Sequence, residues 1–136
     1  MQDQRIIKLL IHNQQEEFFV MRRSMSRTSR PGLPDLPGGH IQVDETDLTG
    51  LDRELVEETG LVLNTEDAIH VGYDAEYEPG EGMCTRVLYM LKIETARPRI
   101  NLSKEHEGYE WVKKDKLTGF DPPYQVLVST AIDFYL

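Results

Sequence analysis

The chain has 136 residues, of which 39% are hydrophobic and 29% charged, and this composition suits one globular domain with a buried core. The formal net charge of −9 argues against a nucleic-acid backbone as the main partner, because proteins that bind one usually carry a basic surface. There is no run of about 18 apolar residues, so no membrane span is expected, and the single cysteine, Cys84, excludes an internal disulfide.

Two short strands are predicted at the start of the chain. Residues 5–12 form a β-branched, apolar run that is typical of a buried strand, and residues 17–22 form a second apolar run. A polar turn, residues 13–16, separates them, so we expect an antiparallel hairpin. Residues 1–5 lack the basic-then-apolar layout of a signal peptide, and a cytoplasmic location is therefore the expectation.

A cluster of arginines follows the second strand. Four of them fall within nine residues, with no acid between them: Arg22, Arg23, Arg27 and Arg30. Guanidinium groups bind phosphates in a bidentate manner, so the cluster is a candidate phosphate-binding site. A solvated loop of ordinary arginines explains the same pattern, and both interpretations stay open.

A loop and a helix come next. Residues 30–39 contain three prolines and three glycines, which forbids a helix or a central strand and predicts a loop. We expect a short strand over residues 40–43. The following segment suits a helix that begins with Thr46 or Asp47 as its N-cap and stops at Gly60.

This helix has an apolar stripe, and its acids begin at the edge of that stripe, where Glu58 lies roughly 20° from Leu51. At about 100° per residue, one stripe holds the apolar residues Leu48, Leu51 and Leu55. Three acids point from one side: Glu54, Glu57 and Glu58. Like charges so close repel, and a divalent cation removes the conflict, because oxygen-only ligands suit a hard ion such as Mg²⁺. A solvated acidic face is the alternative for Glu57 and Glu58 taken alone.

The second half of the chain alternates strands and loops. Residues 69–77 and 86–93 predict a long antiparallel hairpin, and residues 95–104 predict a loop. A strand that contains Trp111 and a short helical turn follow. Residues 124–135 predict a last helix, which we expect to pack over the sheet.

One stretch is similar to the Nudix box. Its pattern is Gly, five residues, Glu, seven residues, then Arg-Glu-apolar-any-Glu-Glu-any-Gly-apolar. The chain matches every specified position: Gly39, Glu45, Arg53, Glu54, Leu55, Glu57, Glu58, Gly60 and Leu61. Nine fixed positions within 23 residues make this a highly specific resemblance to the Nudix hydrolase family.

The resemblance implies a fold and a metal site. The fold is the α/β Nudix fold, a mixed β-sheet sandwiched between α-helices, over a single domain at residues 1–136. Glu54, Glu57 and Glu58 would bind one to three Mg²⁺ ions, with Mn²⁺ as an alternative. The carbonyl of Gly39 would add an oxygen ligand.

The resemblance also assigns roles around that site. Arg53 lies four residues before Glu57 and can steer its carboxylate. Glu45 is expected to brace the loop against the helix, and Gly60 has a structural role at the helix end. In some members an acid from a later loop completes the metal site or acts as the base, and Glu105 is the first candidate here, followed by Glu107.

The activity implied is Mg²⁺-dependent hydrolysis of a pyrophosphate bond in a nucleoside diphosphate linked to another group, with a nucleoside triphosphate as the expected substrate. Glu57, Glu58 or Glu105 would serve as base, and residues 22–30 would hold phosphates. The partner is a small nucleotide, not a nucleic acid or a membrane, and a homodimer is compatible with the resemblance. One alternative is a catalytically silent nucleotide-binding or protein-interaction module. Another is an isopentenyl-diphosphate isomerase that uses Cys84.

Overall fold

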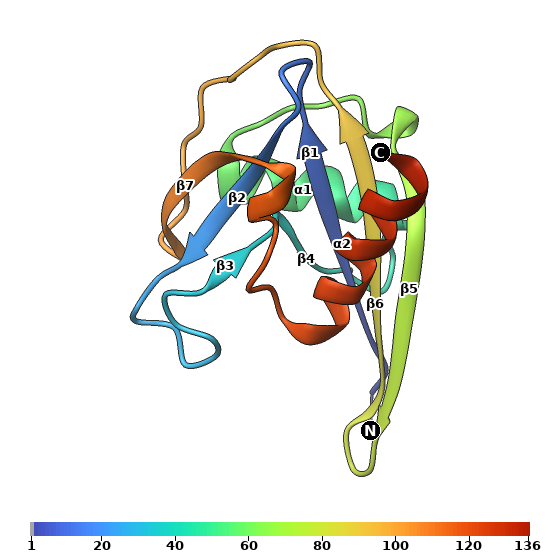
Figure 1. Cartoon of the computed structure of the whole chain (residues 1–136). Coiled ribbons are helices and arrows are strands. Elements are labelled where there is room, and N and C mark those ends of the chain that lie inside the picture. Colours follow the sequence, from blue (N-terminus) through green and yellow to red (C-terminus); the bar gives the residue numbers. More distant parts are fainter. Residues whose placement is uncertain (1) are drawn as a thin grey trace.

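The computed structural model describes residues 2–136, which fold into a mixed β-sheet with one helix on each face (Figure 1). The strands are β1 (Gln4–His12), β2 (Glu17–Arg23), β3 (Pro34–Asp35), β4 (Gly38–His40), β5 (Ile69–Glu78), β6 (Gly82–Lys92) and β7 (His106–Lys113). The helices are α1 (Asp47–Thr59) and α2 (Pro122–Tyr135), and two 3₁₀ turns are η1 (Thr65–Asp67) and η2 (Lys114–Lys116). The fold class expected from the Nudix resemblance is confirmed.

Five strands of the sheet follow the order β3-β2-β1-β6-β5. Within this order β1 and β6 pair in parallel. The pair β5 and β6 is antiparallel and forms the predicted hairpin, although β6 begins at Gly82 and not at residue 86. The predicted hairpin of β1 and β2 holds only at its turn, where His12 pairs with Phe18. Beyond it the strands diverge, because β1 takes β4 and β6 as neighbours while β2 takes β3 and β7.

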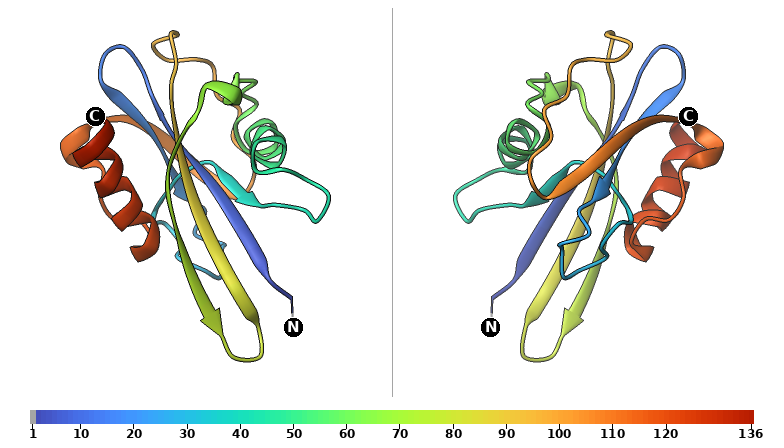
Figure 2. Two further views of the ribbon diagram at one scale, coloured as in Figure 1. Left: turned by 90° about the vertical axis from the view of Figure 1, so that its right-hand side faces the viewer. Right: turned by 90° about the vertical axis from the view of Figure 1, so that its left-hand side faces the viewer.

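The core lies in two layers, one on each side of the sheet. Figure 2 shows α1 and α2 on opposite faces. Alternation along β1 sends Ile7, Leu9 and Ile11 toward α1, where they join Leu51 in one apolar cluster. Leu10 belongs to the other cluster, together with the buried residues of α2. Lys8 and Leu10 therefore share a face, and Lys8 interrupts the apolar run of residues 6–11.

The strand expected at residues 40–43 is wrong in position, because β4 lies two residues earlier at Gly38–His40. Its backbone pairs with β1, Gly38 opposite Lys8 and Gly39 opposite Ile7. Gly38 has a φ of 134°, and a Cβ atom there would lie 2.0 Å from the Ile7 carbonyl oxygen. Only a glycine lets the backbone of β4 approach β1 this closely. The glycines from which a loop is predicted therefore allow strand β4 to form.

Two further expectations need adjustment. The loop expected at residues 30–39 contains the two-residue strand β3, which lies at the sheet edge, where a proline is tolerated. The last helix begins at Pro122, two residues before the expected start. Within residues 2–136, neither helix has the length and apolar character that would let it cross a membrane.

Candidate active site

Helix α1 presents the three acids, and its ends are fixed as the sequence predicts. Thr46 is the N-cap, and it forms a capping box with Thr49. Gly60 ends the helix with a left-handed φ of 74°. The exposed fraction of the acidic side chains differs sharply along the helix, from 57% for Glu57 to 7% for Glu58. The acids therefore face very different surroundings, although they share one side of the helix.

Arg53 gathers the carboxylates around it. Its Nε and Nη2 donate to the two carboxylate oxygens of Glu45, at 2.7 and 2.9 Å. Its Nη1 donates to Glu54 at 3.0 Å and to Glu57 at 3.2 Å, and its Nη2 also reaches the His40 carbonyl at 3.0 Å. The hydrogen bond from Arg53 lowers the pKa of Glu45 to about 2. Arg53 thus stays charged and partly neutralises the acidic face.

Glu45 has the contacts of a brace. Besides Arg53, its carboxylate accepts the backbone N–H of Gln42 at 2.8 Å, which closes the loop between β4 and α1. Gly50 lies beside this loop, and a Cβ on it would approach Ile41 Cδ1 to 2.3 Å and Glu45 Oε1 to 3.2 Å. The small residue in mid-helix is therefore explained by close packing, against the loop after β4.

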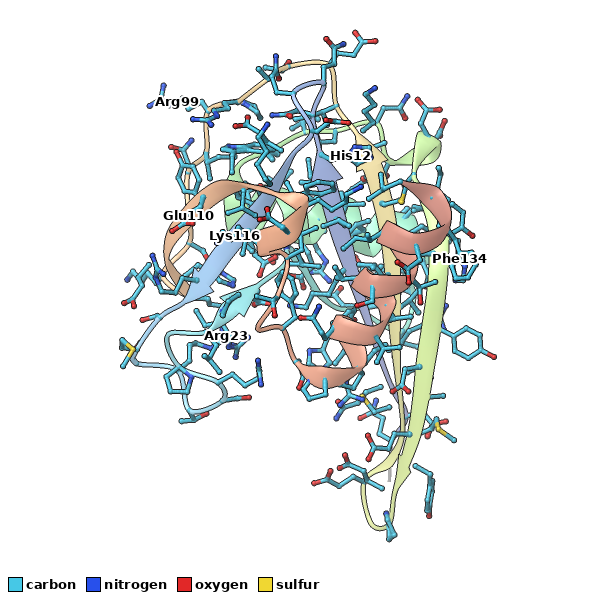
Figure 3. All side chains as sticks on the ribbon, viewed as in Figure 1. His12, Arg23, Arg99, Glu110, Lys116 and Phe134 are labelled. Atoms are coloured by element: carbon cyan, nitrogen blue, oxygen red, sulfur yellow. The ribbon has the colours of Figure 1, made fainter. Side chains whose placement is uncertain are left out.

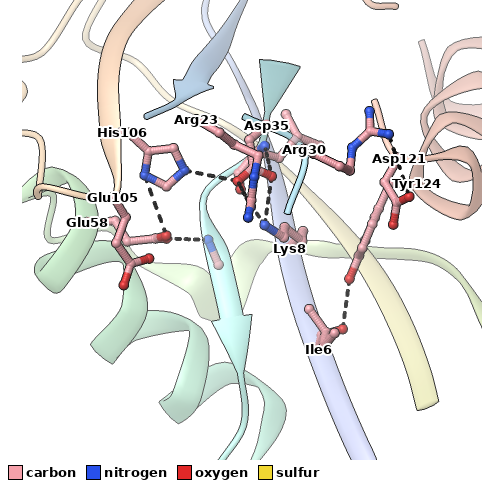
Figure 4. Close-up of polar contacts among 12 residues, drawn as sticks. Ile6, Lys8, Arg23, Arg30, Asp35, Glu58, Glu105, His106, Asp121 and Tyr124 are labelled. Atoms are coloured by element: carbon pink, nitrogen blue, oxygen red, sulfur yellow. Dashed lines mark hydrogen bonds and ion pairs between the residues drawn. The ribbon is translucent and has the colours of Figure 1, made fainter. Parts of the chain in front are cut away.

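Gly38 and Gly39 lie against the other two acids. The Gly38 N–H donates to Glu58 Oε1 at 2.7 Å (Figure 4). A Cβ on Gly39 would lie 2.7 Å from Glu54 Cδ, so the glycine leaves room for that carboxylate. Burial raises the pKa of Glu58 to about 8, and the nearby charge of Lys8 and the Gly38 hydrogen bond offset this only in part.

These residues fit a hard divalent cation by chemistry. The ligands on offer are three carboxylates and the Gly39 carbonyl, all oxygen. Glu58 is buried, and a cation would relieve the cost of ionising it. Within residues 2–136, however, no three His, Cys, Asp or Glu side chains already stand in position to hold a metal. Glu54 and Glu57 turn to Arg53 and Glu58 turns to Gly38, so a cation has to exchange with these hydrogen bonds.

A cavity of about 510 Å³ opens beside the acids. It is lined by residues from both sides of the sheet, because it lies where β1 and β2 have separated. Its acidic wall consists of Glu54, Glu57, Glu58 and Glu105, with Asp35 and Asp121 further along. Its basic residues are Lys8, Arg23, Arg27, Arg30 and Arg86. Carboxylates and cations thus line a single cavity.

The structure brings three of the four candidate arginines to this cavity. Arg23 donates to the Ser29 carbonyl at 2.8 Å, Arg27 to Glu105 at 3.0 Å and Arg30 to the Gly119 carbonyl at 2.8 Å. Arg22 lies outside it and lines a second hollow of about 360 Å³ with Tyr109. The register of β2 against β7 shifts between Arg22 and Arg23, and the two neighbouring arginines line different hollows.

Sequence reasoning missed a buried network centred on Asp35 (Figure 4). Its carboxylate accepts from Lys8 Nζ at 2.8 Å, Arg23 Nη1 at 3.2 Å and His106 Nε2 at 2.9 Å. Burial opposes ionisation of Asp35, but the charge of Lys8 and the hydrogen bond from His106 hold its pKa below the usual range. His106 Nδ1 lies 3.9 Å from Glu58 Oε2, so the network ends at the acids of α1.

We expect Asp35→Ala to destabilise the protein by about 3 kcal/mol, because it leaves His106 Nε2 without its acceptor and Lys8 without its counter-charge, with only the Leu36 carbonyl to accept from it. The side chains of Lys8 and His106 are only 12% and 1% exposed. Denaturant unfolding measures the loss. Asp115→Ala, at an exposed position in η2, is the matched control. An equal, small loss in both variants would show that the network does not stabilise the fold.

Glu105 reaches the cavity and Glu107 does not. The Glu105 side chain is 60% exposed and pairs with Arg27 at 3.0 Å. Glu107 instead accepts the Met25 N–H at 3.4 Å. Cys84, the residue on which the isomerase alternative depends, lies on β6 and is not among the residues that line the cavity.

Known proteins resemble the chain in sequence and in fold. A family model described as the NUDIX domain matches residues 3–129. The m7GpppN-mRNA hydrolase NUDT17 of Danio rerio is 36% identical over 61 residues, 45% of this chain. That match spans only 20% of the zebrafish protein.

Two solved structures cover most of the chain. The MutT protein from Methanosarcina mazei Go1 matches with a TM-score of 0.76 and 26% identity, over 93% of this chain and 91% of that one. A bifunctional NMN adenylyltransferase/ADP ribose pyrophosphatase from Francisella tularensis, in complex with AMP and a Mn ion, matches with a TM-score of 0.71 and 18% identity, over 97% of this chain and 42% of that one. At that identity the second match concerns the fold alone.

Proposed function

The chain belongs to the Nudix hydrolase family, and we propose that it is a Mg²⁺-dependent pyrophosphohydrolase whose substrate is a nucleoside triphosphate. One observation carries the proposal: the acids of α1 and the arginines of residues 23–30 line the same cavity. A polyphosphate needs positive charge along its length. Although the net charge of the chain is −9, the arginines of residues 23–30 supply positive charge locally, at this cavity.

Glu54, Glu57 and Glu58, with the Gly39 carbonyl, would hold the metal, and Mn²⁺ is an alternative occupant. When bound, Mg²⁺ neutralises charge on the reacting phosphate and makes a water molecule more acidic. Arg53 keeps Glu54 and Glu57 on the cavity side of the helix through its Nη1. Gly39 preserves the space beside the Glu54 carboxylate.

Arg23, Arg27 and Arg30 would bind the phosphates. The contact of Arg27 with Glu105 is an exposed ion pair, and such pairs contribute about 1 kcal/mol or less, so a phosphate can displace the carboxylate. The displaced Glu105 would then be free to accept the proton of the attacking water. Glu57 and Glu58 remain candidates for the same role.

Size and charge favour a small nucleotide. A cavity of about 510 Å³ is within the range for sites of small ligands. The zebrafish relative is named as an mRNA hydrolase, but this chain's acidity disfavours a long nucleic acid. The structure from Francisella tularensis is in complex with AMP, which agrees with a nucleotide ligand.

A screen of nucleoside triphosphates and other nucleoside diphosphate derivatives tests the proposal. We expect Mg²⁺-dependent cleavage of a pyrophosphate bond, with one oxygen from ¹⁸O-labelled water in a product. The mass of each product identifies the phosphorus attacked, and a parallel reaction with EDTA is the control. No metal-dependent cleavage of any compound, with nucleotide binding retained, would instead favour a silent binding module.

A further inference from the structure

Arg86, on β6, lines the end of the cavity near α2, and the proposed chemistry does not use it. Its side chain is only 16% exposed. Its Nη1 atom is buried and finds no hydrogen-bond partner among residues 2–136. Three carboxylates surround the guanidinium at longer range: Asp74 at 3.7 Å, Glu76 at 3.7 Å and Asp121 at 3.9 Å. Arg86 is therefore neutralised in charge but retains unused hydrogen-bonding capacity.

This balance of charge decides what Arg86 can bind. One guanidinium faces three carboxylates, so a phosphate placed there would meet a net negative surrounding. A neutral group with a hydrogen-bond acceptor avoids that repulsion and can still accept from Arg86. Asp121 lies beside it at the start of α2 and, with 40% of its side chain exposed, offers an acceptor for N–H groups. The two residues form a donor and an acceptor next to each other.

The surfaces around this pair are apolar and fixed. Ile6, Phe120 and Tyr124 line the same cavity, and Phe120 and Tyr124 are each 5% exposed. The Tyr124 hydroxyl donates to the Ile6 carbonyl at 2.9 Å, which holds the ring in place (Figure 4). Figure 4 also shows Asp121 beside Arg30, whose Nη1 is 4.0 Å away, so this end adjoins the arginines proposed to hold phosphates. A flat ring attached to a phosphate chain fits these surroundings.

We propose that Arg86 and Asp121 determine the base specificity of the substrate and select a 6-oxopurine, guanine. This inference rests on the proposed nucleotide function. The O6 atom accepts from Arg86, while N1–H and the N2 amino group donate to the Asp121 carboxylate. Adenine has an amino donor where guanine has O6, so it would oppose a donor to Arg86. No other common base places two N–H donors beside a carbonyl on one edge.

Binding of nucleoside monophosphates without metal tests this selection separately from hydrolysis. We expect calorimetry in EDTA to show that GMP binds at least about tenfold more tightly than AMP, because one bidentate contact to a base commonly provides that discrimination. The phosphate is common to both ligands and cancels in the ratio. Equal affinities in the wild type would overturn the inference, whether or not the protein hydrolyses triphosphates.

Two substitutions assign the selection to these residues. Asp121→Asn replaces one acceptor oxygen with a donor. We expect it to reduce the ratio of GMP affinity to AMP affinity about tenfold. Arg86→Lys keeps the charge among the three carboxylates but loses the planar fork, and it should weaken GMP binding while AMP binding changes less than about twofold. The GTP/ATP ratio of kcat/KM should follow the same order if the chain hydrolyses them.

Matched variants distinguish specificity from stability. Asp133→Asn lies at an exposed position on the same helix as Asp121 and should leave the ratio unchanged. Arg99→Gln is the control for the arginine substitution and should also leave the ratio unchanged. Arg99 is exposed and lies well away from Arg23 (Figure 3). Circular dichroism confirms folding of each variant. A ratio unaffected by both Asp121→Asn and Arg86→Lys in folded proteins would overturn the assignment.

Discussion

A Glu57→Gln variant is expected to lose about a thousandfold or more in kcat with Mg²⁺, which corresponds to about 4 kcal/mol of barrier. The substitution removes one carboxylate that we propose as a metal ligand and one candidate base, while it keeps the size of the side chain. Glu57 is 57% exposed and contacts Arg53 at 3.2 Å, so the fold should tolerate glutamine well. Single-turnover and steady-state rates on the preferred nucleotide measure the effect.

Glu66→Gln is the matched control for this experiment. Glu66 is an exposed acid in η1 outside the cavity, so its loss should leave kcat within about twofold. Thermal unfolding of both variants shows whether stability has changed. Near-normal turnover of Glu57→Gln with Mg²⁺ would remove the basis for the proposed mechanism.

The second large effect concerns Glu58 and pH. Burial raises its pKa from 4.5 to about 8 in the folded protein. The folded state therefore holds a proton that the unfolded state has released between these values, and stability must fall as pH rises through that interval. For the metal-free protein we expect a loss of about 3 kcal/mol between pH 5 and 8, measured by denaturant unfolding.

Glu58→Gln isolates this contribution. The variant keeps an acceptor for the Gly38 N–H but cannot ionise, so its stability should change much less over the same interval. The difference between the two proteins cancels other titrating groups, such as His12, whose pKa is lowered by burial. Mg²⁺ should restore the wild type at pH 8 and leave the variant unaffected. If the stability of the two proteins changed with pH in the same way, the assignment of this pH dependence to the buried carboxylate of Glu58 would be contradicted.

The sequence predicts the parts of the fold that depend on local patterns. Helix α1 follows from the apolar period of Leu51 and Leu55, the cap at Thr46 and the left-handed stop at Gly60. Strand β4 could not be placed in this way, because it exists through backbone pairing with β1 and glycine composition predicts a loop. The divergence of β1 and β2 is equally non-local, since it depends on which partners each strand finds.

The residues of the candidate site likewise fall into those that a local sequence pattern predicts and those that only the fold brings together. The acids of α1 could be found because they lie on one helix at fixed spacing. Asp35 and His106 could not be paired, because 71 positions separate them and no sequence pattern links the two. One signal was available: Lys8 is charged in a buried apolar strand, and a buried lysine requires an acid nearby. Arg86 gave no comparable signal, since its surroundings come from β5 and α2.

We propose that the α1 acids are tolerated together because a divalent cation binds among them. Titration calorimetry with Mg²⁺, in the presence of a non-hydrolysable nucleotide analogue, tests it most directly. We expect saturable binding to the wild type and a strong reduction in Glu54→Gln and Glu58→Gln. The absence of any Mg²⁺ binding to the folded wild-type protein, with the analogue and without it, would contradict the account.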